Sequence, residues 1–384
     1  MSVPKLRFGD DDGKEFPEWK KRNISEILKI GSGKDYKKLE SGDIPVYGTG
    51  GYMLSVNDYL YDGESVCIGR KGTIDRPVLL SGKFWTVDTL FYTHSFVSSL
   101  PKFIYALFQN IDWKNYNEAS GVPSLSKSTI EKIEVFIPSL PEQTKIANFL
   151  TAVDEKISLL TQKADLLSQY KKGVMQQIFS QELRFKDDDG QEFPEWEEKR
   201  LCDISVLITK GTTPKRFSYE GINFIKIECF DGNLILKEKC AFVDDVTNQK
   251  ELKRSILFDG DILFAIAGAT IGKCNIVIAD ILPANTNQAL AIIRLKENEN
   301  RKYIYHLLTS YKMQKYIGDN ISVGAQPNLN LEQMGNFNIN YPSLPEQTKI
   351  ANFLSAIDEK ITTNQNQLNT VKQYKQGLLQ QMFV

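Results

Sequence analysis

The stretch Pro138–Leu150, PSLPEQTKIANFL, decides the fold, because the same thirteen residues recur without change at Pro342–Leu354. Gln169-Tyr170-Lys171 returns at the same offset of 204 residues as Gln373-Tyr374-Lys375. An identity of this length does not arise by chance, so the chain contains an internal duplication.

Two shorter motifs repeat at a different offset. Leu6-Arg7-Phe8 and Phe16-Pro17-Glu18-Trp19 recur 177 residues later, at 183–185 and 193–196. Because this offset is smaller than 204, the second copy is longer between its shared blocks. Each half therefore has a shared opening, a variable globular part and a shared helical end. We divide the chain into an N-terminal segment 1–19, a first globular domain 20–137, a first helical region 138–182, a repeated opening 183–198, a second globular domain 199–341 and a second helical region 342–384.

Each thirteen-residue block predicts the start of a long helix. Ser139 and Glu142 have the spacing of a capping box, and proline is tolerated in a first helical turn. Apolar residues then recur every three or four positions, and Asn364 and the matched Lys171 and Lys375 interrupt them and would set the register. One such stripe alone would favour a helix packed on its own domain, whereas two matched stripes favour helices packed on each other. The predicted interface residues are Leu150, Val153, Ile157, Leu160, Leu167, Leu354, Ile357, Ile361, Leu368 and Val371.

The two globular parts are weakly alike. Gly63–Ile74 aligns without gaps with Gly260–Ile271, which places Arg70-Lys71-Gly72 opposite Ala267-Gly268-Ala269. Short strand-like runs alternate with turn signals in both parts. The predicted fold class is α+β: two globular domains joined by two long antiparallel coiled-coil helices, with a pseudo-two-fold internal repeat.

The differing loops predict different ligands on one fold. Arg and Lys suit guanine edges and phosphates, and Asn and Gln suit adenine edges, although a single Asn or Gln in a turn more often bonds its own backbone. The DNA-binding candidates of the first domain are Lys34, Tyr36, Lys37, Tyr47, Thr49, Arg70, Lys71, Thr73, Arg76 and Ser124. Those of the second domain are Thr212, Thr213, Lys215, Arg216, Lys226, Thr270, Asn285, Asn287, Gln288, Gln326 and Asn328.

Composition and motifs exclude several classes of protein. The net charge of −1 argues against indiscriminate coating of nucleic acid, although 20–137 and 199–341 carry small basic surpluses of +2 and +3. The five scattered cysteines include no C-x-x-C pair, and neither a signal segment nor a membrane span is expected, so we expect a cytoplasmic protein. Gly31–Lys34 lacks the flanks of a phosphate loop, and His94 and His306 lie far apart. We therefore expect no catalytic residue and no metal site.

The chain resembles the specificity subunits of type I restriction–modification systems. The resemblance is carried by the duplicated Leu-Pro-Glu-Gln helix starts, the Phe-Pro-Glu-Trp repeat and the Gly-x-x-Gly-Thr-Ile loop at Gly69–Ile74, and it covers essentially the whole chain. The second loop departs from that pattern, so contacts inferred for the first are not copied to it.

The resemblance implies a non-catalytic subunit of a bacterial complex. Two target-recognition domains would each recognise one half of a split site in double-stranded DNA, with the helices as spacer. Partners would be two modification (methyltransferase) subunits that bind S-adenosylmethionine, and restriction subunits that use ATP and Mg²⁺, with no cofactor bound by this chain. The alternative is a coiled-coil scaffold whose two duplicated domains bind proteins. A self-contained restriction–methylation enzyme is opposed by the missing motifs.

Overall fold

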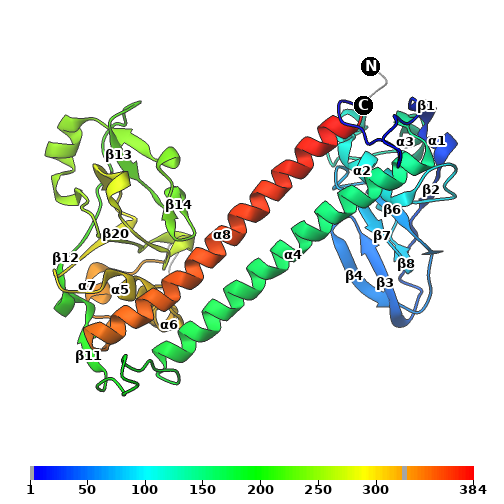
Figure 1. Cartoon of the computed structure of the whole chain (residues 1–384). Helices are drawn as coiled ribbons and strands as arrows, with labels where there is room; N and C mark the ends of the chain where they lie inside the picture. The colour runs from blue at the N-terminus through cyan, green and yellow to red at the C-terminus, as the bar shows by residue number, and fades with distance from the viewer. Residues whose placement is uncertain (1–3, 322–326) are drawn as a thin grey trace. The chain divides into compact units, whose positions relative to one another are not determined.

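The computed structural model describes residues 4–321 and 327–384. The chain forms two compact units, Met1–Gln162 with Gln365–Val384, and Lys163–Asn364. Each unit contains an α+β domain, the first half of one long helix and the second half of the other (Figure 1). The helices are α4 (Leu140–Phe179) and α8 (Leu344–Met382). The units therefore cut across the two linear halves of the sequence.

The first domain contains two four-stranded sheets, with strand orders β2-β9-β6-β7 and β4-β3-β8-β5. A two-stranded sheet, β1-β10, places Lys20 opposite Ile137 where the chain enters and leaves the domain. Phe103 and Ile104 of α2 share a core with Val66 and Ile68 of β6. The elements are β1 (Lys20–Asn23), α1 (Ile24–Ile27), β2 (Lys29–Ser32), β3 (Ser41–Gly48), β4 (Gly51–Val56), β5 (Tyr61–Asp62), β6 (Ser65–Gly69), β7 (Val78–Leu80), β8 (Lys83–Thr86), β9 (Leu90–His94), α2 (Pro101–Asn110), α3 (Lys127–Glu131) and β10 (Glu134–Ile137).

The second domain repeats this plan in the sheets β12-β20-β17-β18, β16-β13-β19 and β11-β21. The pair β13–β19 is parallel, as is β3–β8 in the first domain. The hairpin β14–β15 and helix α6 are additions. The elements are β11 (Glu197–Arg200), β12 (Ser205–Lys210), β13 (Ile222–Ile225), β14 (Phe230–Asp231), β15 (Leu234–Ile235), β16 (Ala241–Val243), β17 (Ile262–Ala265), β18 (Cys274–Ile276), β19 (Ala284–Thr286), β20 (Leu290–Leu295), α5 (Arg301–Leu308), α6 (Tyr311–Asn320), α7 (Leu331–Gly335) and β21 (Asn338–Tyr341).

The two helix segments of the first unit pack on each other. Leu150 of α4 shares a core with Leu378 and Met382 of α8, and four residues further along α4 the Asp154 carboxylate accepts a hydrogen bond from Lys375 Nζ at 2.5 Å. Residue numbers on α8 fall as those on α4 rise, so the segments are antiparallel.

The second unit repeats the arrangement with the roles of the helices exchanged. Lys171 Nζ of α4 donates to the Asp358 carboxylate of α8 at 2.6 Å, and Ile178 and Ile357 lie in one core. Asp358 is the duplicate of Asp154, so each matched lysine pairs with the matched aspartate of the other helix. The antiparallel packing that the heptads predict is thus confirmed within each unit, and the ten predicted interface residues are buried or half-buried.

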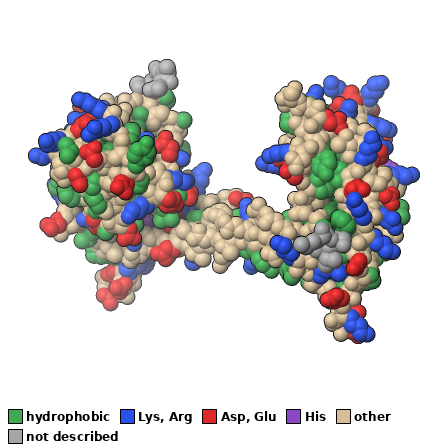
Figure 2. Space-filling view, turned by 90° about the horizontal axis from the view of Figure 1, so that it is seen from above, with side chains coloured by type: hydrophobic (Ala, Val, Ile, Leu, Met, Phe, Trp, Pro, Cys, Tyr) green, Lys and Arg blue, Asp and Glu red, His purple; other side chains and the backbone are tan. Residues whose placement is uncertain are grey.

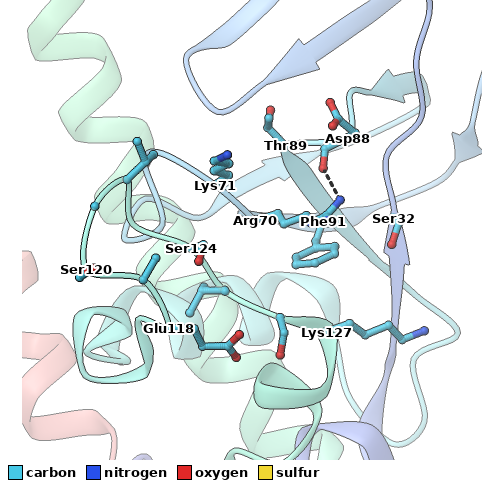
Figure 3. A pocket seen from close by; sticks show the side chains of 15 residues that line it. Ser32, Arg70, Lys71, Asp88, Thr89, Phe91, Glu118, Ser120, Ser124 and Lys127 are labelled. Carbon is cyan, nitrogen blue, oxygen red and sulfur yellow. Dashed lines mark hydrogen bonds between the residues drawn. The ribbon is translucent and has the colours of Figure 1, made fainter.

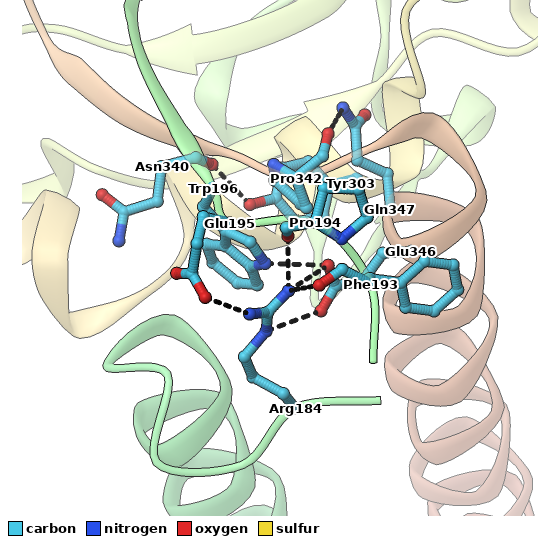
Figure 4. A network of polar contacts seen from close by, with 10 residues as sticks. All are labelled: Arg184, Phe193, Pro194, Glu195, Trp196, Tyr303, Asn340, Pro342, Glu346 and Gln347. Atoms are coloured by element: carbon cyan, nitrogen blue, oxygen red, sulfur yellow. Dashed lines mark hydrogen bonds and ion pairs between the residues drawn. The ribbon is translucent and has the colours of Figure 1, made fainter. Parts of the chain in front are cut away.

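The repeated motifs meet in one buried network in each unit. Figure 4 shows the second, in which the Arg184 guanidinium contacts the Glu346 carboxylate at 3.3 and 3.0 Å. Trp196 Nε1 donates to the same carboxylate at 2.9 Å. Arg184 also donates to the backbone carbonyls of Phe193 and Pro194 at 3.1 and 2.7 Å. The network ties the shared opening to the start of the shared helix.

The first unit contains the same network and corrects one prediction. Arg7 contacts Glu142 at 2.9 and 2.8 Å, and Trp19 Nε1 donates to Glu142 at 3.2 Å. Because these groups occupy the carboxylate, Glu142 does not form the predicted capping box, and Ser139 Oγ has no hydrogen-bond partner among the described residues. The proline in the first turn is confirmed, since α4 begins at Leu140.

Candidate nucleic-acid interface

The first domain has a polar hollow of about 970 Å³, here called the larger hollow (Figure 3). It brings together three of the predicted residues, Arg70, Lys71 and Ser124. The Arg70 guanidinium donates to the backbone carbonyl of Asp88 at 3.4 Å, as the dashed line in Figure 3 shows. The residues that sequence reasoning missed are Ser32, Asp88, Thr89, Phe91, Glu118, Ser120 and Lys127, with their neighbours in the 118–127 segment.

A smaller hollow of about 740 Å³ adjoins it. Three further predicted residues, Tyr36, Lys37 and Thr49, line this smaller hollow. Asp88 and Thr89 line both hollows, so six predicted residues from distant parts of the sequence lie on one continuous surface. We call this surface, formed by the linings of the two hollows, the recognition surface of the first domain.

Glycine at two positions shapes the boundary between the hollows. A Cβ on Gly69 would overlap the carbonyl oxygen of Thr73 and lie 3.2 Å from the Thr49 side chain. Gly72 has φ +91°, a left-handed conformation that favours glycine. The loop that carries Arg70 is therefore held close to Thr49.

Four predicted residues of the first domain line neither hollow. The Lys34 N–H donates to the Thr86 carbonyl at 2.8 Å, which fixes its backbone while its side chain is exposed. The Tyr47 ring lies 6.3 Å from the Tyr52 ring. Thr73 is half-buried and Arg76 is exposed.

In the second domain, predicted residues gather beside β19. The Thr213 hydroxyl donates to Gln288 Oε1, and Arg254 Nε donates to the Thr212 hydroxyl at 3.1 Å. A Cβ on Gly211 would overlap the carbonyl oxygen of Asn287, so glycine is needed for this approach. Arg254 is the cation that the sequence analysis missed.

The remaining candidates of the second domain have other surroundings. Lys226 Nζ lies 4.5 Å from the centre of the Phe217 ring. Arg216 and Asp244 form an exposed ion pair at 3.6 Å, and the Thr247 hydrogen bonds, followed by Arg216, lower the pKa of Asp244. Lys215, Thr270 and Asn328 are exposed or half-buried, and Gln326 lies outside the described residues.

Asn285 corrects one of the predictions. Its side chain is buried in β19, and its amide nitrogen donates to Asn248 Oδ1 at 2.9 Å and to the Leu252 carbonyl at 3.2 Å. Its hydrogen bonds are used inside the domain, so it cannot contact a base edge. Asn285 belongs to the strand β19 and not to an exposed loop.

The gapless alignment of the two loops is also wrong by one residue. The Gly72 N–H donates to the Pro123 carbonyl at 2.8 Å, and the matching bond in the second domain, at 3.1 Å, comes from Gly268, which also has positive φ. Arg70 therefore corresponds to the buried Ile266, not to Ala267. A shift of one residue exchanges the two faces of a strand, so the alignment had assigned each side chain to the wrong face.

Charge is mixed over the visible face of each domain, where Figure 2 shows Lys and Arg interspersed with Asp and Glu. This pattern agrees with the formal net charge of −1. Among residues 4–321 and 327–384, no three His, Cys, Asp or Glu side chains are grouped so that they could hold a metal ion. In the same part of the chain, no helix is long and apolar enough to cross a membrane.

The two domains share one fold but have different polar surfaces, and each domain packs with a pair of helix segments. These features define a recognition protein with two separate binding domains. The family model described as type I restriction modification DNA specificity domain matches the chain twice, over residues 17–169 and 194–373. The chain therefore belongs to the family of type I restriction–modification specificity subunits.

Known proteins agree with this family. The chain is 26% identical to the type I restriction enzyme MjaVIII specificity subunit of Methanocaldococcus jannaschii, over 92% of this chain and 83% of that protein. It is 26% identical to the type I restriction enzyme EcoBI specificity subunit of Escherichia coli, over 94% and 78%. The fold matches the crystal structure of the type I S subunit from M. genitalium with a TM-score of 0.68 at 16% identity, covering 100% of this chain and 99% of that one.

The family decides between the functions considered from the sequence. A type I specificity subunit is a non-catalytic DNA-recognition subunit, so the resemblance is confirmed and both the protein-binding scaffold and the self-contained enzyme are rejected.

Proposed function

We propose that each α+β domain recognises one half of a bipartite duplex target through direct readout. The observation that carries this proposal is that one backbone frame presents different exposed polar side chains in the two domains. In the first domain Arg70, Lys71 and Lys37 supply donors for guanine edges and phosphates. In the second, Gln288 contacts Thr213 and Arg254 contacts Thr212, beside the turn that follows β19. Different side chains on one frame would recognise different half-sites.

We also propose that two modification subunits bind the exposed part of the repeated helix starts. Within each thirteen-residue block, the exposed residues Leu140, Pro141, Thr144 and Asn148 of α4, and their duplicates on α8, form an identical surface. Leu140 is 46% exposed and Leu344 47%, which leaves an apolar side chain available to a partner in each unit. Two identical surfaces would bind two copies of one partner.

Membership of the family supports a proposal for the remaining components. We place S-adenosylmethionine on the modification subunits, and ATP with Mg²⁺ on restriction subunits, in the cytoplasm of a bacterial cell. This chain would supply the sequence preference and its helices would set the spacing between half-sites.

The test is methylome sequencing of cells with and without this chain. We expect one bipartite methylated motif to disappear when the gene is deleted, and replacement of residues 20–137 by another recognition domain to change one half-site only. Removal of one heptad from both α4 and α8 should change the number of unspecified base pairs and leave both half-sites unaltered. A motif that survives deletion of the gene would refute the proposal.

A further inference from the structure

The turn that follows β8 is held in place by the rest of the first domain. The carbonyl of Thr86, just before the turn, accepts the N–H of Lys34 at 2.8 Å. The carbonyl of Thr89, at the end of the turn, accepts the N–H of Arg70 at 2.8 Å. A Cβ on Gly33 would overlap the backbone of the turn, so the neighbouring strand end approaches as closely as glycine allows.

The turn after β19 has the same backbone frame. Thr286 accepts the N–H of Thr212 at 3.0 Å, and Ala289 accepts the N–H of Ile266 at 2.9 Å. Gly211 provides the same close approach as Gly33. Two turns with matching hydrogen bonds on both sides position their side chains in the same way.

The side chains on this shared frame differ. The exposed residue of the first turn is Asp88 and that of the second is Gln288. Asp88 lines both hollows, and among the described residues no Lys or Arg side chain forms an ion pair with its carboxylate. Arg70 contacts the backbone carbonyl of Asp88 instead. Gln288 Oε1 accepts from Thr213 and keeps a second lone pair, and its amide nitrogen remains a donor.

We propose that this turn carries a base-reading side chain in each domain: Asp88 accepts a hydrogen bond from the N4 amino group of a cytosine, and Gln288 pairs with the N6 and N7 edge of an adenine. The inference rests on the proposed DNA-reading function. A carboxylate repels phosphates, so its useful contact on a DNA surface is a base amino group, and cytosine N4 is its usual partner in the major groove. A glutamine matches adenine by one acceptor and one donor.

The experiment uses the full chain assembled with its modification subunits and measures methylation of duplex libraries in which each half-site position is randomised. Asp88→Asn should lower the preference for cytosine at one position of one half-site by about tenfold, since a good base contact is worth that much discrimination. Asp88→Glu, which keeps the carboxylate, should retain the cytosine preference. Gln288→Ala should relax one adenine position in the other half-site.

Asp43→Asn is the matched control, because Asp43 is exposed on β3 of the same domain, outside both hollows. It should leave every position unchanged. An intact other half-site reports that each variant is folded and assembled. If Asp88→Asn weakens methylation of all sequences equally, or leaves the cytosine preference unaltered, the assignment is overturned. If the unmodified complex shows no bipartite preference at all, the proposed function itself fails.

Discussion

Replacement of Arg7 by alanine should lower the free energy of unfolding by about 3–5 kcal/mol, the usual cost of removing one partner of a buried ion pair. The Glu142 side chain is 0% exposed and that of Arg7 16%, so the variant leaves a carboxylate that is buried in the native protein without its charged partner. It would keep one hydrogen bond, from Trp19 Nε1 at 3.2 Å, and lose the two from Arg7. Urea unfolding followed by circular dichroism would measure the change.

The second unit and the protein surface supply the comparisons. Arg184→Ala should cost a similar amount, because the network with Glu346 is the same. Arg22→Ala should cost less than about 1 kcal/mol, because Arg22 and Glu26 are 49% and 45% exposed and their pair is 3.5 Å long. The double change Arg7→Ala with Glu142→Gln should recover part of the loss, since no buried charge is left unpaired. The reasoning is refuted if Arg7→Ala destabilises no more than Arg22→Ala.

Three further changes test other parts of the structure. Gly33→Ala should abolish recognition of the first half-site in methylation assays and spare the second, because the added Cβ overlaps the Val87 carbonyl. Lys375→Met should destabilise by about 1–3 kcal/mol in urea, since it removes the partner of Asp154 at 2.5 Å. Burial, with a smaller effect of nearby lysines, lowers the pKa of His306 to about 3. The unfolded chain takes up the proton near pH 6.5, so stability should be full above that pH and fall by about 2 kcal/mol from pH 7 to pH 5, a slope that His306→Gln should flatten.

The architecture could be predicted from the sequence because the patterns that specify the long helices lie within short stretches of the chain. Heptad spacing predicts the helices, and matched lysines mark their register, although the aspartates that pair with them were not identified. The predicted capping box was wrong although the spacing of Ser139 and Glu142 fits one. The Glu142 carboxylate is bound instead by Arg7, which lies 135 residues away along the chain. Long-range competition of this kind cannot be seen in a four-residue pattern.

The candidate site was predicted less well, for reasons visible at single residues. The gapless loop alignment failed because the second copy has one extra residue after Gly268, and a strand shifted by one exchanges its faces. The prediction that Asn285 contacts DNA was wrong because a polar residue suggests an exposed position, whereas the Asn285 amide forms its hydrogen bonds inside the domain, from β19. Asp88 was not predicted as a DNA-binding residue because the candidates were chosen mainly for basic and amide side chains, and Asp88 carries a carboxylate. One signal could have found it: Thr86 and Leu90 recur as Thr286 and Leu290 with the same spacing.

The thirteen identical residues of each helix start now separate into two groups with different explanations. Glu142 and Gln143 are buried in bonds to their own unit, as are their duplicates, so the fold alone accounts for their identity. Thr144 and Asn148 are exposed and lie four positions apart, on one face of the helix. The exposed residues of the globular domains differ between the two copies, so shared ancestry alone does not preserve exposed residues. The proposed partner, bound twice, would account for identity on this exposed helical face.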